Sequence, residues 1–230
     1  MQLDVFDAAD AVAEAAAGII AAQARSAVRE RARFVFAVSG GRTPQQMLRL
    51  LSREDVPWHG VHLFQVDERI GPPGHPDRNL TGLRESLTAN VPLAVDQIHG
   101  MPVEAVDLDA ATESYERELS AFAGAPPVLD LVHLGLGPDG HTASLLPEDQ
   151  ALELTAADVA LTGRYQGRRR MTMTYPILNR ARHILWLVTG HEKAPMLARL
   201  LARDRSIPAG RVNQSHARVL ADRAASGRDS

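Results

Sequence analysis

A short apolar run that ends abruptly in a glycine-rich turn is the feature that most constrains this chain. Residues 129–134 read Leu-Asp-Leu-Val-His-Leu, a pattern typical of a strand buried on both faces. The run stops at a turn over 135–140 that holds three glycines and a proline, which prevent either regular structure from continuing. Open α/β sheets bind ligands at the carboxyl ends of such strands. We therefore expect Asp139 and His141 to project into a cleft.

Two other interpretations of this turn remain open. Gly135, Gly137 and Gly140 have the spacing of a dinucleotide-binding loop, but a proline lies inside the turn, and Pro147 leaves little room for the long helix that such a loop requires. The second alternative is an ordinary strand-to-helix turn whose histidine is simply exposed.

The charge and composition of the chain exclude several classes of partner. With 25 Lys and Arg against 28 Asp and Glu, the net charge is -3. We therefore expect no binding to nucleic acid or to an anionic membrane, and an anion must be held by a local cluster of donors. Cysteine is absent, which excludes disulfides and thiolate chemistry. No signal-like start and no apolar stretch of about 18 residues is present, so the sequence predicts a cytoplasmic protein.

Strand-like and helix-like segments alternate along the chain. Apolar runs typical of strands lie at 3–6, 34–38, 61–66, 129–134, 159–162, 170–174, 183–188 and 217–221, and the run at 170–174 alternates as in a half-buried strand. Helical segments are expected at 8–31, 44–51, 79–87, 107–122, 175–181 and 194–202. This order predicts a mostly parallel, Rossmann-like sheet with helices on both faces. We expect one domain over 1–225 and a disordered tail over 226–230.

The segment after the strand at 34–38 is suited to binding phosphate. Residues 39–44 read Ser-Gly-Gly-Arg-Thr-Pro, and Thr43 is expected to cap the helix that Pro44 opens. The two glycines allow several backbone N–H groups to face one point, and the positive end of the helix adds its field. The predicted donors are Ser39, Gly40, Gly41, Arg42 and Thr43. An ordinary capped helix is the alternative, and the G-K-[ST] ending of a Walker loop is missing.

Polar residues also follow the strands at 61–66, 129–134 and 183–188. Asp67-Glu68-Arg69 ends the strand at 61–66, and Lys193 lies in the first turn of a helix, where a cation is misplaced unless an anion is also present. Because the carboxyl ends of parallel strands share one edge, all four strand ends are expected to converge on one cleft. The expected phosphate partners are Arg42, Arg69, Arg170 and Lys193, which leaves Asp67, Asp139 and His141 for proton transfer. No H-x-x-x-H or H-E-x-x-H spacing occurs, so we predict no required metal.

Taken in order, these motifs resemble those of a known family. The most specific part is G-L-G-P-D-G-H-T-A-S-L-L-P at 135–147, and the match runs from about Leu3 to Ala225. The other parts are S-G-G-R-T-P at 39–44, D-E-R at 67–69, Arg170 before the alternating strand, and G-H-E-K at 190–193. In these motifs the chain is similar to the 6-phosphogluconolactonases, whose fold is shared with glucosamine-6-phosphate deaminase.

The resemblance implies hydrolysis of 6-phospho-D-glucono-1,5-lactone to 6-phospho-D-gluconate in the oxidative pentose phosphate pathway, with His141 as the catalytic acid and base. An imidazole can activate water near neutral pH and return a proton to the leaving ring oxygen, and backbone N–H groups of the glycine turns with a nearby Arg can stabilise the oxyanion. Asp139 or Asp67 is expected to orient the imidazole. Asp139 lies only two positions before His141 in the same turn, which is an awkward spacing for direct contact. We expect a sugar phosphate lactone as ligand, no cofactor, and a monomer or weak homodimer.

The chain departs from the family pattern in three places. Arg42 stands where relatives often have Ser, and Asp77-Arg78-Asn79 replaces a more usual Ser-Asn pair. Three consecutive arginines occupy 168–170, so Arg170 is chosen only for its position before the strand.

Two other functions remain open besides lactone hydrolysis. A sugar-phosphate deaminase or isomerase of the same fold would supply a glutamate soon after the Asp-Gly-His turn, whereas here Glu148 comes only beyond Pro147. A sugar-phosphate sensor would bind without turnover. The absence of an appended pair of DNA-binding helices argues against a sensor, and binding without release of acid would favour one.

Overall fold

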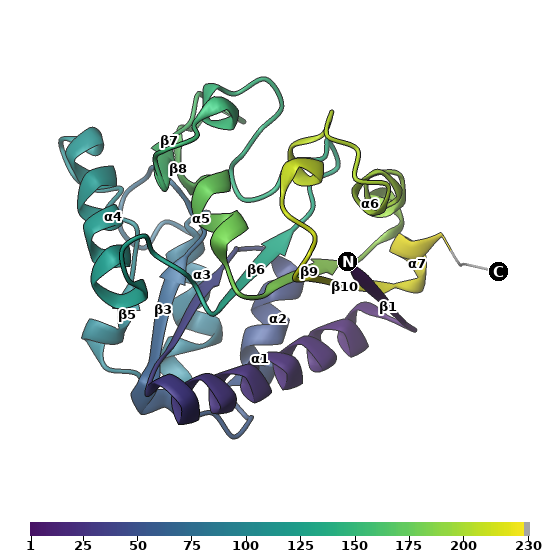
Figure 1. Cartoon of the computed structure of the whole chain (residues 1–230), viewed down its shortest axis with the longest axis horizontal. Coiled ribbons are helices and arrows are strands. Elements are labelled where there is room, and N and C mark those ends of the chain that lie inside the picture. The colour runs from purple at the N-terminus through teal and green to yellow at the C-terminus, as the bar shows by residue number, and fades with distance from the viewer. Residues whose placement is uncertain (228–230) are drawn as a thin grey trace.

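A seven-stranded parallel sheet forms the centre of the molecule in the computed structural model, which describes residues 1–227 (Figure 1). Every neighbouring pair of its strands is parallel, and the order across the sheet is β1 (Gln2–Phe6), β10 (Ala217–Asp222), β9 (Ile184–Val188), β6 (Leu131–Gly135), β2 (Phe34–Val38), β3 (Val61–Gln65) and β5 (Ile98–His99). Strands β2 and β9 are apolar runs buried at all five positions, as expected for strands covered on both faces. The predicted fold class is confirmed.

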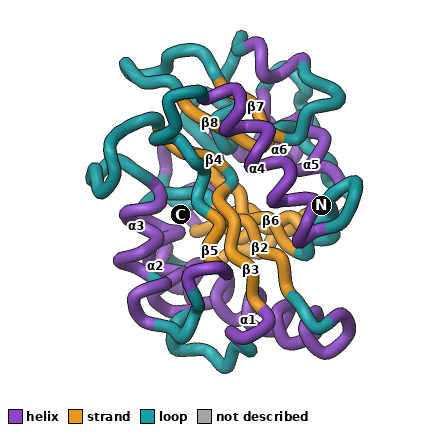
Figure 2. The backbone as a smooth tube through the Cα atoms, turned by 90° about the vertical axis from the view of Figure 1, so that its left-hand side faces the viewer, coloured by secondary structure: helices purple, strands orange, loops and turns teal. Residues whose placement is uncertain are grey.

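Helices cover both faces of this sheet, as Figure 2 shows from the side. One face is covered by α1 (Ala9–Arg31), α2 (Arg42–Leu51) and α3 (Asn79–Ser86), and the other by α4 (Leu108–Ala123), α5 (Tyr175–Arg180) and α6 (Ala194–Leu201). Most of the buried residues of α1 are alanines, so this helix packs close to the sheet and to α2. Each face therefore has its own hydrophobic cluster.

A second, three-stranded antiparallel sheet was not predicted. It consists of β4 (Asp67–Arg69), β8 (Arg170–Met173) and β7 (Val159–Leu161), with β8 in the middle. The segment Asp67–Arg69, expected as a charged strand end, is therefore itself a strand that pairs with β8. The half-buried character predicted for 170–174 was wrong, because all four residues of the central strand β8 are buried.

Several predicted boundaries differ from the structure by one or two residues, and three of these differences concern predicted site residues or the end of the chain. Helix α2 begins at Arg42 with Gly41 as its N-cap, so Thr43 lies inside the first turn and does not cap the helix. Lys193 ends a short 3₁₀ helix directly before α6. Ser226 ends a short helix, α7 (Arg223–Ser226), so the predicted tail begins too early, and residues 228–230 lie outside the described residues.

The remaining short elements are 3₁₀ helices at Trp58–Gly60, Thr88–Asn90, Val95–Gln97, Gln150–Glu153, His191–Lys193 and Pro208–Arg211. Within residues 1–227, no helix has the length and apolar character needed to span a bilayer.

The strand order determines where a ligand can bind. From β2 the chain continues to β3 and β5 on one side of the sheet, whereas β6 lies on the other side of β2, beside β9, β10 and β1. The progression of strands thus reverses between β2 and β6, and open α/β sheets bind ligands in the crevice at such a switch point. The segments after β2, β6 and β9 meet at this crevice.

Candidate active site

A cleft with about 1020 Å³ of empty volume opens at the carboxyl edge of the large sheet. Every predicted site residue except Asp139 lines it, namely Ser39, Gly40, Gly41, Arg42, Thr43, Asp67, Arg69, His141, Arg170 and Lys193. These residues come from the segments after β2, β6 and β9 and from strands β4 and β8. The predicted convergence of separate strand ends on one cleft therefore agrees with the structure.

Asp139 does not line the cleft, but it contacts His141, which does. Oδ1 of Asp139 lies 2.5 Å from Nδ1 of His141 and also accepts a hydrogen bond from the backbone N–H of His141 at 3.2 Å. The turn is closed by the N–H of Gly137, which donates to the carbonyl of His141 at 2.8 Å. This tight closure brings the carboxylate against the ring, so the spacing that looks awkward in the sequence allows direct contact.

The charge of Asp139 determines how the imidazole is protonated. Burial acts to raise the pKa of Asp139, but the charge of His141 and the hydrogen bonds from it prevail, so this pKa lies below its usual value. An ionised carboxylate beside Nδ1 keeps the ring proton on that nitrogen, which leaves Nε2 unprotonated in the neutral ring. Within residues 1–227, the hydrogen bonds of the His141 ring involve Nδ1 and none involves Nε2.

The position of the imidazole requires glycine at residue 137. A Cβ atom built on Gly137 would lie only 2.1 Å from Nδ1 of His141. Any side chain there would displace the ring from Asp139. The glycine-rich turn therefore serves close packing of the histidine against its own backbone.

The loop after β2 presents unpaired amides at a helix N-terminus. The N–H groups of Gly40, Gly41, Arg42 and Thr43 have no acceptor among the described residues, and they lie at the start of the ten-residue helix α2. Aligned free amides with the field of a helix form an anion-binding site. A Cβ atom on Gly40 would lie 2.0 Å from Oδ1 of Asn79, so a larger residue here would displace the Asn79 side chain from its place at the cleft.

Ser39 lines the cleft and is also hydrogen-bonded to the neighbouring strand β6. Its N–H donates to Nδ1 of His133 at 3.3 Å and its hydroxyl donates to the carbonyl of His133 at 3.1 Å. Both donors of Ser39 are thus used inside the protein, and Ser39 anchors the start of the loop. Thr43 joins the two sides of the cleft, because its Oγ1 lies 2.8 Å from Oγ1 of Thr189.

Asp67 belongs to a buried polar cluster. Its Oδ2 accepts from the hydroxyl of Ser144 at 2.5 Å, and the same hydroxyl accepts from Nη1 of Arg170 at 3.4 Å. Burial raises the pKa of Asp67, although the hydrogen bond from Ser144 and the charges of Arg69 and Arg170 oppose the rise. No hydrogen bond joins Asp67 to His141 in the described chain. Asp139 therefore contacts the imidazole directly, and Asp67 does not.

Glu68 holds the start of α3 beside the cleft. The Glu68 side chain is fully buried and accepts from the N–H groups of Asn79 at 2.8 Å and Leu80 at 2.9 Å, at the start of α3. Asn79 then donates to the carbonyl of Asp67 at 2.8 Å and accepts from Nη1 of Arg69 at 2.8 Å. Asn79 thus ties α3 to the cleft, which it also lines.

The three consecutive arginines have separate environments. Arg170 is 5% exposed and lines the cleft. Arg169 is exposed and reaches only the carbonyl of Thr162, at 3.4 Å. Arg168 contacts Oδ2 of Asp77 at 3.3 Å. Of the three, Arg170 is thus the one placed to meet a ligand in the cleft.

Comparison with known proteins agrees with this arrangement. The model of the family described as glucosamine-6-phosphate isomerases/6-phosphogluconolactonase matches residues 7–221. The chain belongs to this family. It is 38% identical over 206 residues to the 6-phosphogluconolactonase of Synechocystis sp., with 87% of this chain and 85% of the relative covered. It is 35% identical over 240 residues to that of Mycobacterium tuberculosis, with 98% and 97% covered.

Solved structures of the family share the fold. The crystal structure of a 6-phosphogluconolactonase from Thermotoga maritima is similar with a TM-score of 0.85 at 26% identity, covering 96% of this chain and 98% of the other. A monomeric glucosamine-6-phosphate deaminase has a TM-score of 0.84 at 20% identity, covering 99% and 100%. The predicted sharing of one fold by lactonases and deaminases is therefore confirmed.

Sequence reasoning missed several cleft residues of this family member. Asn79, Ala143, Thr189 and Glu192 line the cleft without having been proposed as site residues. Ala143 and Glu192 lie inside motifs of the family resemblance and Asn79 in a segment compared with it, so these segments held a signal for them. Tyr165, which contacts Asp139, lies in a basic loop without any recognisable pattern.

Proposed function

We propose that this chain hydrolyses 6-phospho-D-glucono-1,5-lactone to 6-phospho-D-gluconate, a step of the oxidative pentose phosphate pathway. The observation that carries the proposal is the meeting of two features in one cleft. One is the pair of Asp139 and His141, joined at 2.5 Å. The other is the loop of unpaired amides over 40–43. The names of the relatives support the same substrate.

The phosphoryl group is assigned to the loop after β2. The free amides of 40–43 and the N-terminus of α2 favour an anion there. Lys193 and Arg42 line the same cleft and add positive charge. Nη1 of Arg69 donates to Asn79 and to the carbonyl of Asp77, so this guanidinium is held in a fixed position at the cleft wall. These groups would hold the phosphorylated end of the sugar.

The ester end is assigned to His141. Nε2 of the neutral imidazole takes a proton from water as the water oxygen attacks the lactone carbonyl carbon. Asp139 stabilises the imidazolium that forms. The tetrahedral oxyanion is assigned to Arg170 and to backbone N–H groups of the glycine turn. When the bond to the ring oxygen breaks, the imidazolium returns the proton to that oxygen, which gives the hydroxy acid and restores the neutral ring.

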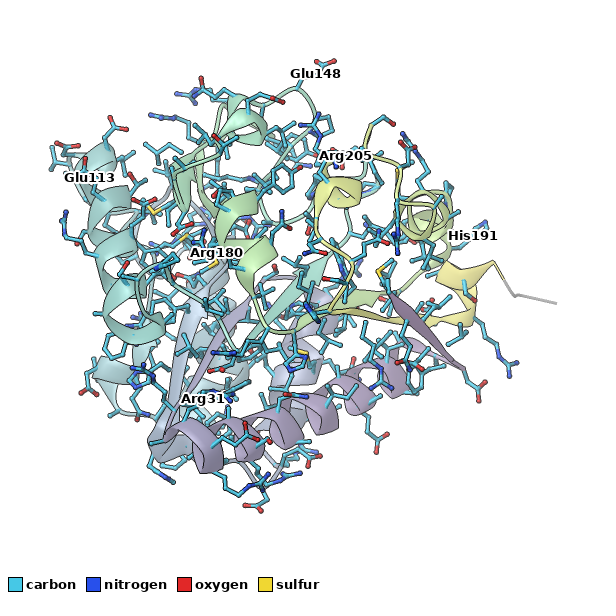
Figure 3. The ribbon with its side chains drawn as sticks, viewed as in Figure 1. Arg31, Glu113, Glu148, Arg180, His191 and Arg205 are labelled. Carbon is cyan, nitrogen blue, oxygen red and sulfur yellow. The ribbon has the colours of Figure 1, made fainter. Side chains whose placement is uncertain are left out.

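The position of Glu148 argues against a deaminase or isomerase. That activity on this fold would place a glutamate of this segment in the cleft. Glu148 is exposed, does not line the cleft, and extends from the outer edge of the molecule in Figure 3. Thus the glutamate that the alternative requires is missing from the site.

An assay with freshly prepared lactone tests the proposal. Wild-type protein should release acid well above the spontaneous rate, and His141→Asn should lose roughly 10²- to 10⁴-fold of this rate, the usual contribution of a general acid–base group. His216→Ala is a matched control, because His216 is exposed directly before β10 and does not line the cleft. A wild-type rate no faster than the spontaneous one would reject the proposal. Binding of the lactone without release of acid would favour the sensor. Release of ammonia from glucosamine 6-phosphate would favour the deaminase.

A further inference from the structure

A tight hairpin joins β7 to β8 beside the catalytic pair. We call residues 163–169 the cover loop. Tyr165 and Arg168 pair through both backbone hydrogen bonds, at 2.9 and 3.2 Å. The two residues between them, Gln166 and Gly167, have φ values of 50° and 79°. Such a two-residue connection with positive φ at both positions is the favoured turn between antiparallel strands, so the backbone of Tyr165 is held firmly.

The side chain of Tyr165 contacts three groups of the site. Its hydroxyl lies 3.3 Å from Oδ2 of Asp139, the carboxylate oxygen that His141 does not use. Its ring and the imidazole of His141 meet edge to face, with 5.8 Å between ring centroids and 64° between ring planes. The guanidinium carbon of Arg170 lies 5.0 Å above the centre of the ring, a cation–π distance.

We propose that Tyr165 is a positioning residue for the lactone hydrolysis proposed above, acting through its hydroxyl on Asp139 and through its ring on Arg170. A carboxylate held by only one oxygen can rotate, and the hydrogen bond to the imidazole then weakens. With Oδ1 held by His141 and Oδ2 held by Tyr165, the plane of the carboxylate is fixed. Supporting hydrogen bonds of this kind set the orientation of groups that react.

Arg168 holds the cover loop in place. Its Nη2 lies 3.3 Å from Oδ2 of Asp77 and 3.1 Å from Nε2 of His75. At the other end of the loop, the N–H of Gly163 donates to Oδ2 of Asp149 at 2.8 Å. The loop is therefore attached to two separate segments, and Tyr165 does not depend on a single contact for its position.

The ionisation of Tyr165 agrees with a donor function. Burial raises the pKa of the Tyr165 phenol, and the charge of Asp139 and the hydrogen bond to it raise this pKa further. The hydroxyl thus keeps its proton at neutral pH and can donate to the carboxylate.

Two substitutions separate the hydroxyl from the ring. Tyr165→Phe keeps the ring and removes the donor, so kcat should fall about tenfold with little change in KM, the effect of losing one hydrogen bond to a charged group. Tyr165→Leu also removes the ring face from Arg170, so kcat should fall further and KM should rise. Arg164→Ala is the control within the loop, because Arg164 is exposed and reaches only the carbonyl of Gly167. If Tyr165→Phe matches an active wild type in kcat, the inference is wrong and the proposed function is unaffected.

A titration tests the same contact without any activity. The phenol of Tyr165 can be followed by NMR of ¹³C-labelled tyrosine and assigned with the Tyr165→Phe variant. Asp139→Asn should lower the pKa of Tyr165, because it removes the charge that raises this pKa. An unchanged titration would overturn the inference. A wild type without lactonase activity would reject the proposed function, and the titration would still decide whether Tyr165 holds Asp139.

Discussion

The backbone N–H of Ser39 donates to Nδ1 of His133, 3.3 Å away, at the point where β2 leads into the glycine loop at 39–43. His133 lies in the middle of β6 and is fully buried. Its Nδ1 can accept this hydrogen bond only when it carries no proton. Burial lowers the pKa of His133 to about 3, so the ring stays neutral and the start of the loop stays anchored.

Acid should destabilise the fold through His133. In the unfolded chain this histidine takes up a proton below its usual pKa of 6.5, whereas in the fold it does so only near 3. The unfolded state therefore binds more protons in this window, and stability is lost as the pH falls through it. Between about pH 7 and about pH 5, this one group should cost about 2 kcal/mol of unfolding free energy.

Urea denaturation of His133→Asn measures this loss. The Asn oxygen can accept from the N–H of Ser39, but the side chain does not titrate. The unfolding free energy of the variant should therefore fall by about 2 kcal/mol less than that of the wild type between the two pH values. Equal pH dependence in both proteins would contradict the expectation.

Replacing Asp139 should reduce turnover and spare substrate binding. In Asp139→Asn the amide cannot stabilise the imidazolium, and its NH₂ group can favour the wrong ring tautomer. We expect kcat to fall at least about 100-fold, within the range for disturbed acid–base groups, while KM changes little because the phosphate loop is intact. Steady-state kinetics with the lactone check this, and a kcat equal to that of the wild type would mean that the contact between Asp139 and His141 has no catalytic consequence.

Lys193 should matter only for phosphorylated substrate. It lines the cleft that also holds the free amides of 40–43. Lys193→Ala should raise KM for the 6-phosphorylated lactone roughly tenfold, as expected for one lost charge-assisted contact, and leave the hydrolysis of unphosphorylated gluconolactone unchanged. Arg53→Ala removes the same charge from an exposed position outside the cleft. An equal effect of Lys193→Ala on both lactones would show that Lys193 does not bind phosphate.

A methyl group at residue 137 should be sufficient to inactivate the site. In Gly137→Ala the new Cβ would meet Nδ1 of His141 at 2.1 Å, so the ring must leave Asp139 and kcat should fall about as far as in Asp139→Asn. Gly18→Ala is a control for the substitution itself, because a Cβ there meets nothing within 4 Å. The two variants should unfold at temperatures close to that of the wild type. Full activity of Gly137→Ala would show that His141 works from another position.

The local sequence pattern was sufficient to predict most strands of the large sheet. The strand predicted at 34–38 matches β2 at both ends, because five apolar residues lie between Arg33 and Ser39 and the sheet buries all five. Strand β4 was missed for the opposite reason. Its three residues, Asp67, Glu68 and Arg69, are all charged, and they form a strand only because β8 pairs with them.

The sequence by itself determined the strand and turn that carry His141, the glycine loop at 39–43 and the family to which the chain belongs, because these features depend on residues next to one another. Only the tertiary structure decided that Asp139 and not Asp67 contacts the imidazole, that Ser39 is anchored by His133, and that Tyr165 reaches Asp139. The last two contacts join residues 94 and 26 positions apart. Contacts between residues so far apart form only when the whole chain packs, so local sequence patterns do not reveal them.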